Sequence, residues 1–300
     1  MIIESYMILD EVDVHEDGAD YILQPWADVQ RIGDAIANST NLLSLGIQEF
    51  GDDEMVVAAQ WLFDVFRGLA RNRSIENLEI NGVHYTTWNP FEAILPFFEH
   101  NRNLRSIQLH CFDLTQDNFE SFLFALSLCD SNQLERILLI DNNWGAIEVT
   151  RFINSLGDHH NLLELEIRDN IISRDRFLAL SKLLQCPMSK INCLKVGDSF
   201  DDECIAIFTG ALVVNKTIKI LEVNGRNVTN VTANGWVILS CVLRSPICLL
   251  KRLSLHRATL DDESITAIGD SLVKNKVLNI LISVAMIRSH RLDGTAFRFA

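Results

Sequence analysis

The chain has 300 residues, of which 48% are hydrophobic and 22% charged, so it can bury a core and does not have the composition of a disordered protein. Its 40 acidic residues outnumber its 26 lysines and arginines, which gives a formal net charge of −14. Such a surface repels phosphate backbones and anionic membranes, so we expect neither nucleic acid nor a membrane as a partner.

The start of the chain and its cysteines indicate a cytoplasmic protein, with a nuclear location left open. Residues 1–11 have no basic flank and become acidic early, which does not fit a secretory signal. No apolar run approaches the roughly 20 residues that span a bilayer. The seven cysteines are odd in number and lack C-x-x-C spacing, so we expect reduced thiols. The Asn-x-Ser/Thr triplets are then interpreted as chance matches; they begin at Asn38, Asn72, Asn215, Asn227 and Asn230.

Residues 1–40 differ from the rest of the chain and predict an N-terminal cap. We expect a short strand at residues 21–23 and a helix at residues 28–38. That helix is expected to cover the open side of the first repeat.

From residue 41 onward one short phrase recurs: an apolar residue, two others, an apolar residue, one other and a third apolar residue. A ninth copy, from Leu278, ends on Ser283 instead of an apolar residue. The mean spacing of about 29.5 residues is typical of a repeat protein. The clear copies begin at Leu42, Ile75, Leu104, Leu134, Leu162, Ile191, Ile218 and Leu250.

The segments between the phrases have helical patterns. Phe119, Phe122 and Leu126 recur at helical spacing, as do Phe177, Leu180 and Leu184, and also Ile265, Ile268 and Leu272. Two of these segments open with matching acidic runs at residues 201–203 and 261–263, and both continue to an Asn-Lys pair, at 215–216 and 275–276. Carboxylates suit helix starts because they meet free backbone N–H groups there. Each repeat is therefore predicted to be a strand, a turn, a helix and a return turn.

One such repeat is too small to bury its own apolar faces, so the repeats must stack. Strands spaced by roughly 4.8 Å and helices spaced by roughly 8–10 Å give a curved stack with the parallel strands on the inside. We therefore predict a single α/β solenoid domain over residues 1–300. It consists of the cap at 1–40, about nine repeats of about 28–30 residues at 41–284, and a C-terminal end at 285–300 without a clear helix.

The last predicted strand contains Ile280, Ile282 and Val284, although a terminal repeat needs a polar outer face. Four interpretations stay open: a loosely packed final repeat, an unusual or incomplete cap, an edge for self-association, or a chain shorter than its functional whole.

The stretches Leu134-x-x-Ile137-x-Leu139-x-x-Asn142 and Leu162-x-x-Leu165-x-Ile167-x-x-Asn170 match a family consensus. On these phrases the chain resembles the leucine-rich-repeat family, within it the long-repeat ribonuclease-inhibitor-like class, over residues 41–284. The resemblance implies a right-handed horseshoe with strands on the concave face and helices on the convex face. The consensus asparagine, three residues after the last apolar position of the phrase, occurs only at Asn142 and Asn170. No regular row of asparagines is therefore expected at that position.

Motifs for chemistry are missing. Neither a nucleotide-binding glycine loop nor H-E-x-x-H occurs. His159 and His160 lie in a predicted turn, where adjacent side chains diverge and no third ligand is apparent. Cys186 and Cys193 have no base placed beside them and are interpreted as partly buried thiols. We therefore expect no catalytic residue, no cofactor and no metal site, and a protein that is not an enzyme.

The residues that alternate with the apolar positions of each phrase face away from the core and are expected to line the concave wall. Leu138 and Ile140 are expected to be exposed apolar anchors with a charged rim, unless a flanking loop or side chain covers them. The candidate partner-binding residues are Asn77, Glu79, Asn81, Gln108, His110, Arg136, Leu138, Ile140, Glu164, Glu166, Arg168, Lys195, Glu222, Asn224, Arg252 and His256.

These observations favour a protein–protein interaction scaffold or recognition module that binds a macromolecular partner on the strand face. The resemblance implies an alternative, a regulator of an enzyme such as a GTPase activator or an enzyme inhibitor. An activator would need an arginine or asparagine on a loop, for which Arg226 and Arg257 are candidates that nothing selects. The sequence does not identify the partner.

Overall fold

The computed structural model describes residues 6–8, 24–48, 64–81, 90–111, 116–129, 133–142, 144–168, 174–197, 201–224, 231–256 and 260–284. The chain divides into two compact units. The N-terminal unit comprises residues 1–171 and 186–191, and the C-terminal unit comprises residues 172–185 and 192–300. In both units parallel strands alternate with helices, which defines an α/β solenoid.

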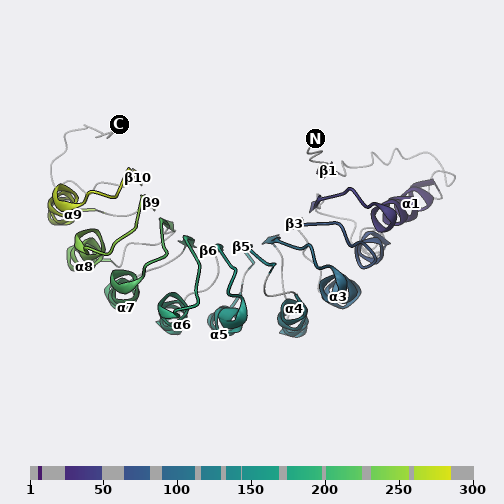
Figure 1. Ribbon diagram of the computed structural model, residues 1–300, viewed down its shortest axis with the longest axis horizontal. Helices are drawn as coiled ribbons and strands as arrows, with labels where there is room; N and C mark the ends of the chain where they lie inside the picture. Colours follow the sequence, from purple (N-terminus) through teal and green to yellow (C-terminus); the bar gives the residue numbers. More distant parts are fainter. Residues whose placement is uncertain are drawn as a thin grey trace, which may run out of the picture. The chain divides into compact units, whose positions relative to one another are not determined.

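The N-terminal unit contains a parallel sheet whose strands follow one another in chain order. In Figure 1 its helices lie on one side of the strands. The strands are β1 (Tyr6–Ile8), β2 (Ser44–Gln48), β3 (Asn77–Asn81), β4 (Ser106–His110), β5 (Arg136–Ile140) and β6 (Glu164–Arg168). The helices are α1 (Gln24–Asn38), a helix at residues 64–69, α3 (Pro90–His100), α4 (Gln116–Leu128), α5 (Ala146–Ser155) and the short η1 (Leu156–Asp158).

The C-terminal unit repeats the same arrangement, and its strands also pair in parallel and in chain order. Its helices pack in succession, each against the next. The strands are β7 (Cys193–Gly197), β8 (Ile220–Asn224), β9 (Arg252–His256) and β10 (Ile280–Val284). The helices are α6 (Arg174–Gln185), α7 (Asp202–Val214), α8 (Ala233–Arg244) and α9 (Asp262–Lys274).

The strands β2 to β10 coincide with the nine phrases, which confirms the predicted alternation. The second and fourth residues of each strand from β2 to β9 are buried; in β5 these are Ile137 and Leu139. Two features of the cap differ from the prediction. A strand that was not predicted, β1, pairs with β2, and α1 begins at Gln24. The strand predicted at 21–23 lies outside the described residues.

Aromatic side chains join successive repeats of the N-terminal unit. The ring of Phe122 lies 5.1 Å from Phe91, 5.5 Å from Trp144 and 6.1 Å from Phe152, measured between centroids. These residues come from α3, α4, α5 and the turn before α5, so one cluster spans three repeats. The burial of large rings between neighbouring repeats is what a single repeat cannot achieve by itself.

The predicted acidic helix starts are confirmed in the C-terminal unit. The Asp201 carboxylate accepts the Cys204 N–H at 2.8 Å at the start of α7, and the Asp261 carboxylate accepts the Ser264 N–H at 2.9 Å at the start of α9. The apolar stripe predicted for α9 is wrong at Ile265, which is 40% exposed. Among the described helices, α8 is the main neighbour of α9, which leaves the other flank of its apolar stripe more open.

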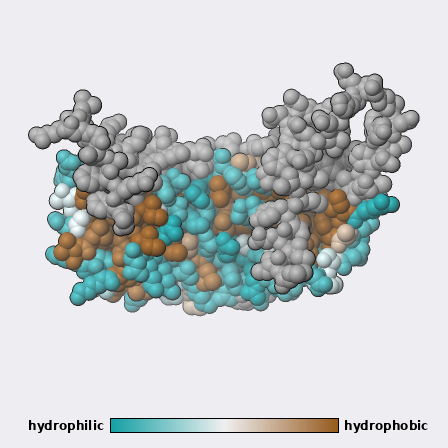
Figure 2. All heavy atoms as spheres, turned by 90° about the horizontal axis from the view of Figure 1, so that it is seen from above, coloured by the Kyte–Doolittle hydropathy of each residue, from teal (hydrophilic) through white to brown (hydrophobic). Residues whose placement is uncertain are grey.

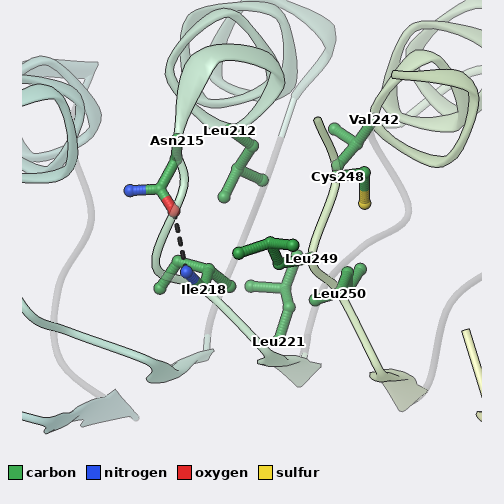
Figure 3. Close-up of a pocket in the computed structure, with 8 residues that line it drawn as sticks. All are labelled: Leu212, Asn215, Ile218, Leu221, Val242, Cys248, Leu249 and Leu250. Atoms are coloured by element: carbon green, nitrogen blue, oxygen red, sulfur yellow. Dashed lines mark hydrogen bonds between the residues drawn. The ribbon is translucent and has the colours of Figure 1, made fainter. Parts of the chain in front are cut away.

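A buried or partly buried asparagine lies where several helices turn into the next strand. We call Asn72, Asn101, Asn215 and Asn275 the asparagine ladder. Each is three residues before the first apolar residue of a phrase. The Asn215 side-chain oxygen accepts the Ile218 N–H at 2.8 Å (Figure 3) and the Thr217 N–H at 2.9 Å.

The amide nitrogen of each ladder residue donates to a main-chain oxygen of the preceding repeat. Asn215 reaches Leu184 at 2.8 Å, and Asn275 reaches Leu243 at 2.8 Å. Asn72 and Asn101 make the same kind of bond in the N-terminal unit. The ladder therefore both shapes each turn and joins one repeat to the next. Because Asn72 and Asn215 are buried and bonded through their amides, their Asn-x-Ser/Thr triplets do not present a glycan acceptor in the folded chain.

Candidate protein-binding surface

The strand register of the N-terminal unit arranges the predicted binding residues in three rows across the sheet, which we call rungs. The first rung contains Asn77, Ser106, Arg136 and Glu164. The middle rung contains Glu79, Gln108, Leu138 and Glu166. The third rung contains Asn81, His110, Ile140 and Arg168.

Polar groups on these rungs bind one another. Arg136 Nε donates to Glu164 Oε2 at 2.8 Å along the first rung, and Gln108 donates to Glu79 at 3.0 Å along the middle rung. Residues on neighbouring strands of one sheet face are close enough for such pairs. The register therefore partly neutralises the charged face before any partner arrives.

The expected apolar anchor is wrong at Leu138, which is 6% exposed. Its register neighbours on either side are Gln108 and Glu166, and Glu166 is itself only 1% exposed and paired with Arg168. Strands about 4.8 Å apart place these longer side chains against the leucine. Ile140 keeps intermediate exposure. Leu138 and Glu166 are therefore part of the packing of this face.

The C-terminal unit has rungs of its own. Lys195, Glu222 and Ser254 share one rung, and Gly197, Asn224 and His256 share the next. The ring of His256 lies between two neighbours: its Nε2 is 3.0 Å from the Ser254 hydroxyl oxygen and 3.5 Å from Glu222 Oε1. Arg252 lies on the remaining rung, beside Ile220.

Fourteen of the sixteen predicted binding residues keep intermediate or full solvent exposure, the two others being Leu138 and Glu166. Figure 2, which looks onto the strand side of Figure 1, shows hydrophilic surface interrupted by hydrophobic patches. Transient protein interfaces are about as apolar as the rest of a protein surface, so this mixture fits a binding face without marking one.

Most of the histidines and cysteines singled out in the sequence are buried or partly buried in the fold. His159 is 8% exposed and occupies the ladder position of its repeat; burial lowers its pKa. His160 is only partly buried in the same turn. Cys193 is buried and Cys186 is partly buried, as expected, and none of the seven cysteines forms a disulfide. Burial and Asp201 raise the pKa of the Cys204 thiol to about 12, which makes it unreactive.

Sequence reasoning missed one group. His110, Cys111 and Asp141 place their ligand atoms within 4.8 Å of one another. Cys111 and Asp141 both come two residues after the last apolar position of a phrase, so aligning neighbouring repeats would have brought them side by side.

Three other features were considered as possible sites: a cavity, two loop arginines and a membrane-spanning helix. The cavity drawn in Figure 3, between Leu212 and Leu250, measures about 10 Å³, which is the lower limit for one water molecule. Arg226 and Arg257 lie outside the described residues. No helix in the part of the chain that the structure describes is long and apolar enough to cross a membrane.

The C-terminal edge has exposed apolar side chains. Ile280 on β10 is 46% exposed and Val273 on α9 is 85% exposed, whereas residues 285–300 lie outside the described part. Self-association through this edge stays a prediction.

All-parallel strands, one per repeat, with helices between them define a repeat protein that fits the leucine-rich-repeat class. No family model matches the chain. Over 124 residues the chain is 29% identical to "NACHT, LRR and PYD domains-containing protein 9B" of Mus musculus. The matched stretch covers 41% of this chain and 12% of the mouse protein. This similarity is to a protein that contains leucine-rich repeats, and it agrees with the strand–helix repeat.

Proposed function

We propose that the chain is a non-catalytic recognition module that binds a protein partner through the rungs of its strand face. The proposal includes membership of the ribonuclease-inhibitor-like class and a cytoplasmic location. The observation that carries it is the side-by-side register of polar, solvent-accessible residues along the N-terminal unit, from Asn77 to Arg168, with the helices on the other side. The similarity to a leucine-rich-repeat protein supports it.

The rungs suit recognition because their side chains stand on a hydrogen-bonded frame. A partner would therefore pay little conformational entropy for ordering the surface that it contacts. The charges on the rungs are partly exposed, so they can select a partner of complementary charge and raise the rate of association. The partner's contacts are expected around Arg136 and Ile140 in one unit and around Lys195 and Asn224 in the other, rather than at Leu138.

The test compares Arg136→Glu with Arg151→Glu in quantitative affinity purification from the native cell followed by mass spectrometry. Both arginines pair with a glutamate and are similarly exposed, 49% and 45% of their side chains, but Arg151 lies on helix α5. We expect Arg136→Glu to lose the specific partner and Arg151→Glu to keep it. Equal partner lists for the two variants would contradict binding on this face.

The C-terminal unit is tested separately with Lys195→Glu against Lys182→Glu, which lies on α6. If Lys195→Glu loses the partner and Lys182→Glu keeps it, the partner also contacts the strand face of this unit. The identity of the captured protein then decides the alternative of an enzyme regulator, because an enzyme partner can be assayed with and without the purified chain.

A further inference from the structure

Two neighbouring repeats of the N-terminal unit leave the sheet through the same unusual turn. Cys111 follows β4 with a φ of 51°, and Asp141 follows β5 with a φ of 55°. Both are in the left-handed region, which residues other than glycine seldom adopt. The Cys111 N–H donates to the Ile140 carbonyl at 3.0 Å, so the two turns are held side by side.

The turns bring three different metal-binding groups together. His110, the last residue of β4, is the register partner of Ile140 and adjoins Cys111. The imidazole, the thiol and the Asp141 carboxylate have ligand atoms that all lie within 4.8 Å of one another. The Cys111 sulfur is 3.8 Å from Asp141 Oδ2.

The distance between the Cys111 sulfur and the Asp141 carboxylate is close to that between two ligands of a tetrahedral ion. With zinc–sulfur and zinc–oxygen bonds of about 2.3 and 2.1 Å, a sulfur and an oxygen on one zinc ion are about 3.6 Å apart. The Cys111–Asp141 pair therefore needs only a small movement to share an ion. All three residues are partly exposed, which leaves an entry path.

We propose that His110, Cys111 and Asp141 bind one Zn²⁺ ion, with a fourth position open. A nitrogen, a sulfur and an oxygen ligand suit zinc, whereas Mg²⁺ and Ca²⁺ take oxygen ligands almost exclusively. Binding replaces the thiol proton of Cys111 with the metal and releases that proton to solvent. The site lies at the end of the third rung, next to Ile140, so binding the ion neutralises the negative charge of Asp141 at this end of the strand face.

The experiment titrates the chelator-treated full chain with Co²⁺ alone and then displaces the Co²⁺ with Zn²⁺. We expect one ion per chain and a thiolate-to-cobalt charge-transfer band in the near ultraviolet, which Zn²⁺ removes. Cys111→Ser is expected to abolish the band. Losing a group that merely orients a ligand costs about 10–100-fold in affinity, so losing a ligand is expected to weaken Zn²⁺ binding at least about 100-fold.

A second ligand variant, Asp141→Asn, keeps the size of the side chain and a residue that tolerates the left-handed turn, so it should fold. We expect it, too, to weaken Zn²⁺ binding at least about 100-fold. The matched controls are Cys186→Ser and His160→Gln, a cysteine and a histidine of the same unit outside the group, and both should bind as the wild type does.

Three results would overturn the proposal: Co²⁺ binding without the charge-transfer band, wild-type binding well below one ion per chain, or unchanged affinity in folded Asp141→Asn. Circular dichroism of each variant establishes that it is folded. None of these readouts depends on a protein partner, so the zinc site and the proposed recognition function can fail separately.

Discussion

Two sets of polar side chains in this molecule differ in burial and in the groups that they bind. The asparagine ladder lies in the turns between helices and strands, where Asn72 and Asn101 are 0% and 2% exposed and bind main-chain groups. The rungs lie on the strand face, where Arg136 and Glu164 are partly exposed and bind each other. A hydrogen bond to buried main chain cannot be replaced by water, whereas a bond between exposed side chains can.

The comparison separates residues that hold the solenoid together from residues that are available for binding. A ladder asparagine satisfies groups from two repeats at once, so its loss is felt across the boundary between them. A rung residue can exchange its neighbour for a group of a partner at low cost. Removing the same kind of side chain is therefore expected to lower the free energy of unfolding much more in the ladder than on the rungs.

The largest effect is expected for Asn215→Ala. It leaves the N–H groups of Thr217 and Ile218 and the carbonyl of Leu184 without their partner in a buried turn. We expect the free energy of unfolding, measured with urea, to fall by about 3 kcal/mol. Asn224→Ala on the strand face removes the same amide and is expected to change it by less than about 0.5 kcal/mol. Equal losses in the two variants would contradict the distinction between ladder and rungs.

The next largest effect is expected on the pH dependence of stability. It comes from His159, which occupies the ladder position of its repeat. Its Nδ1 is buried without a hydrogen-bond partner, and burial lowers its pKa below the ordinary 6.5. The unfolded chain therefore takes up a proton near pH 6.5 that the folded chain does not. Stability is full above this pH and falls as the pH drops toward the lowered pKa, by at most about 1.4 kcal/mol per pH unit.

Replacing His159 with asparagine, the residue of the other ladder positions, should remove this part of the pH dependence. Thermal unfolding of wild type and His159→Asn between pH 7.5 and about 5 measures it. His160→Asn is the control and should keep the wild-type slope, because His159 is still present. A loss of stability toward low pH in His159→Asn as steep as in the wild type would show that His159 is not the group responsible.

The strands were predictable from the sequence and the ladder was not, for a physical reason. Buried apolar residues such as Leu165 recur at fixed spacing, so the phrase alone locates each strand. The Asn-Lys pairs at 215–216 and 275–276 were visible as a repeat marker, but the bonds of an amide depend on the main chain of the preceding repeat. The consensus asparagine position of the family is a different place in the repeat. Asn142, which occupies it, donates to the Leu109 carbonyl, and Asn170 lies outside the described residues.

The binding face was predicted in position but not in exposure. Alternation along a strand correctly assigned Leu138 to the outer face. Its burial depends on which residues stand beside it on neighbouring strands, here Gln108 and Glu166, and on how they pair. Strand register across repeats carries that information, and it also underlies the proximity of Cys111 and Asp141.

A smaller effect is expected at the helix start held by Asp261. Its carboxylate accepts the N–H and the hydroxyl of Ser264 at 2.9 and 2.6 Å, and these bonds lower its pKa. Asp261→Ala should destabilise the chain by about 1 kcal/mol at neutral pH, as measured by urea unfolding. Because the pKa is lowered, the stabilisation is present above the unfolded pKa of about 4 and is lost as the pH falls further. Asp262→Ala, one residue later, removes an equal charge without the cap and should cost less.

The smallest effect is expected on the rungs, at Arg136 and Glu164. A double-mutant cycle with alanine should give a coupling energy of about 0.2–1 kcal/mol that decreases as salt is added, because the pair is partly exposed. A coupling above about 2 kcal/mol would mean that the pair is a structural element like the ladder. A weak coupling has a functional consequence: a partner's carboxylate can take the place of Glu164 on Arg136 while the repeat stays folded.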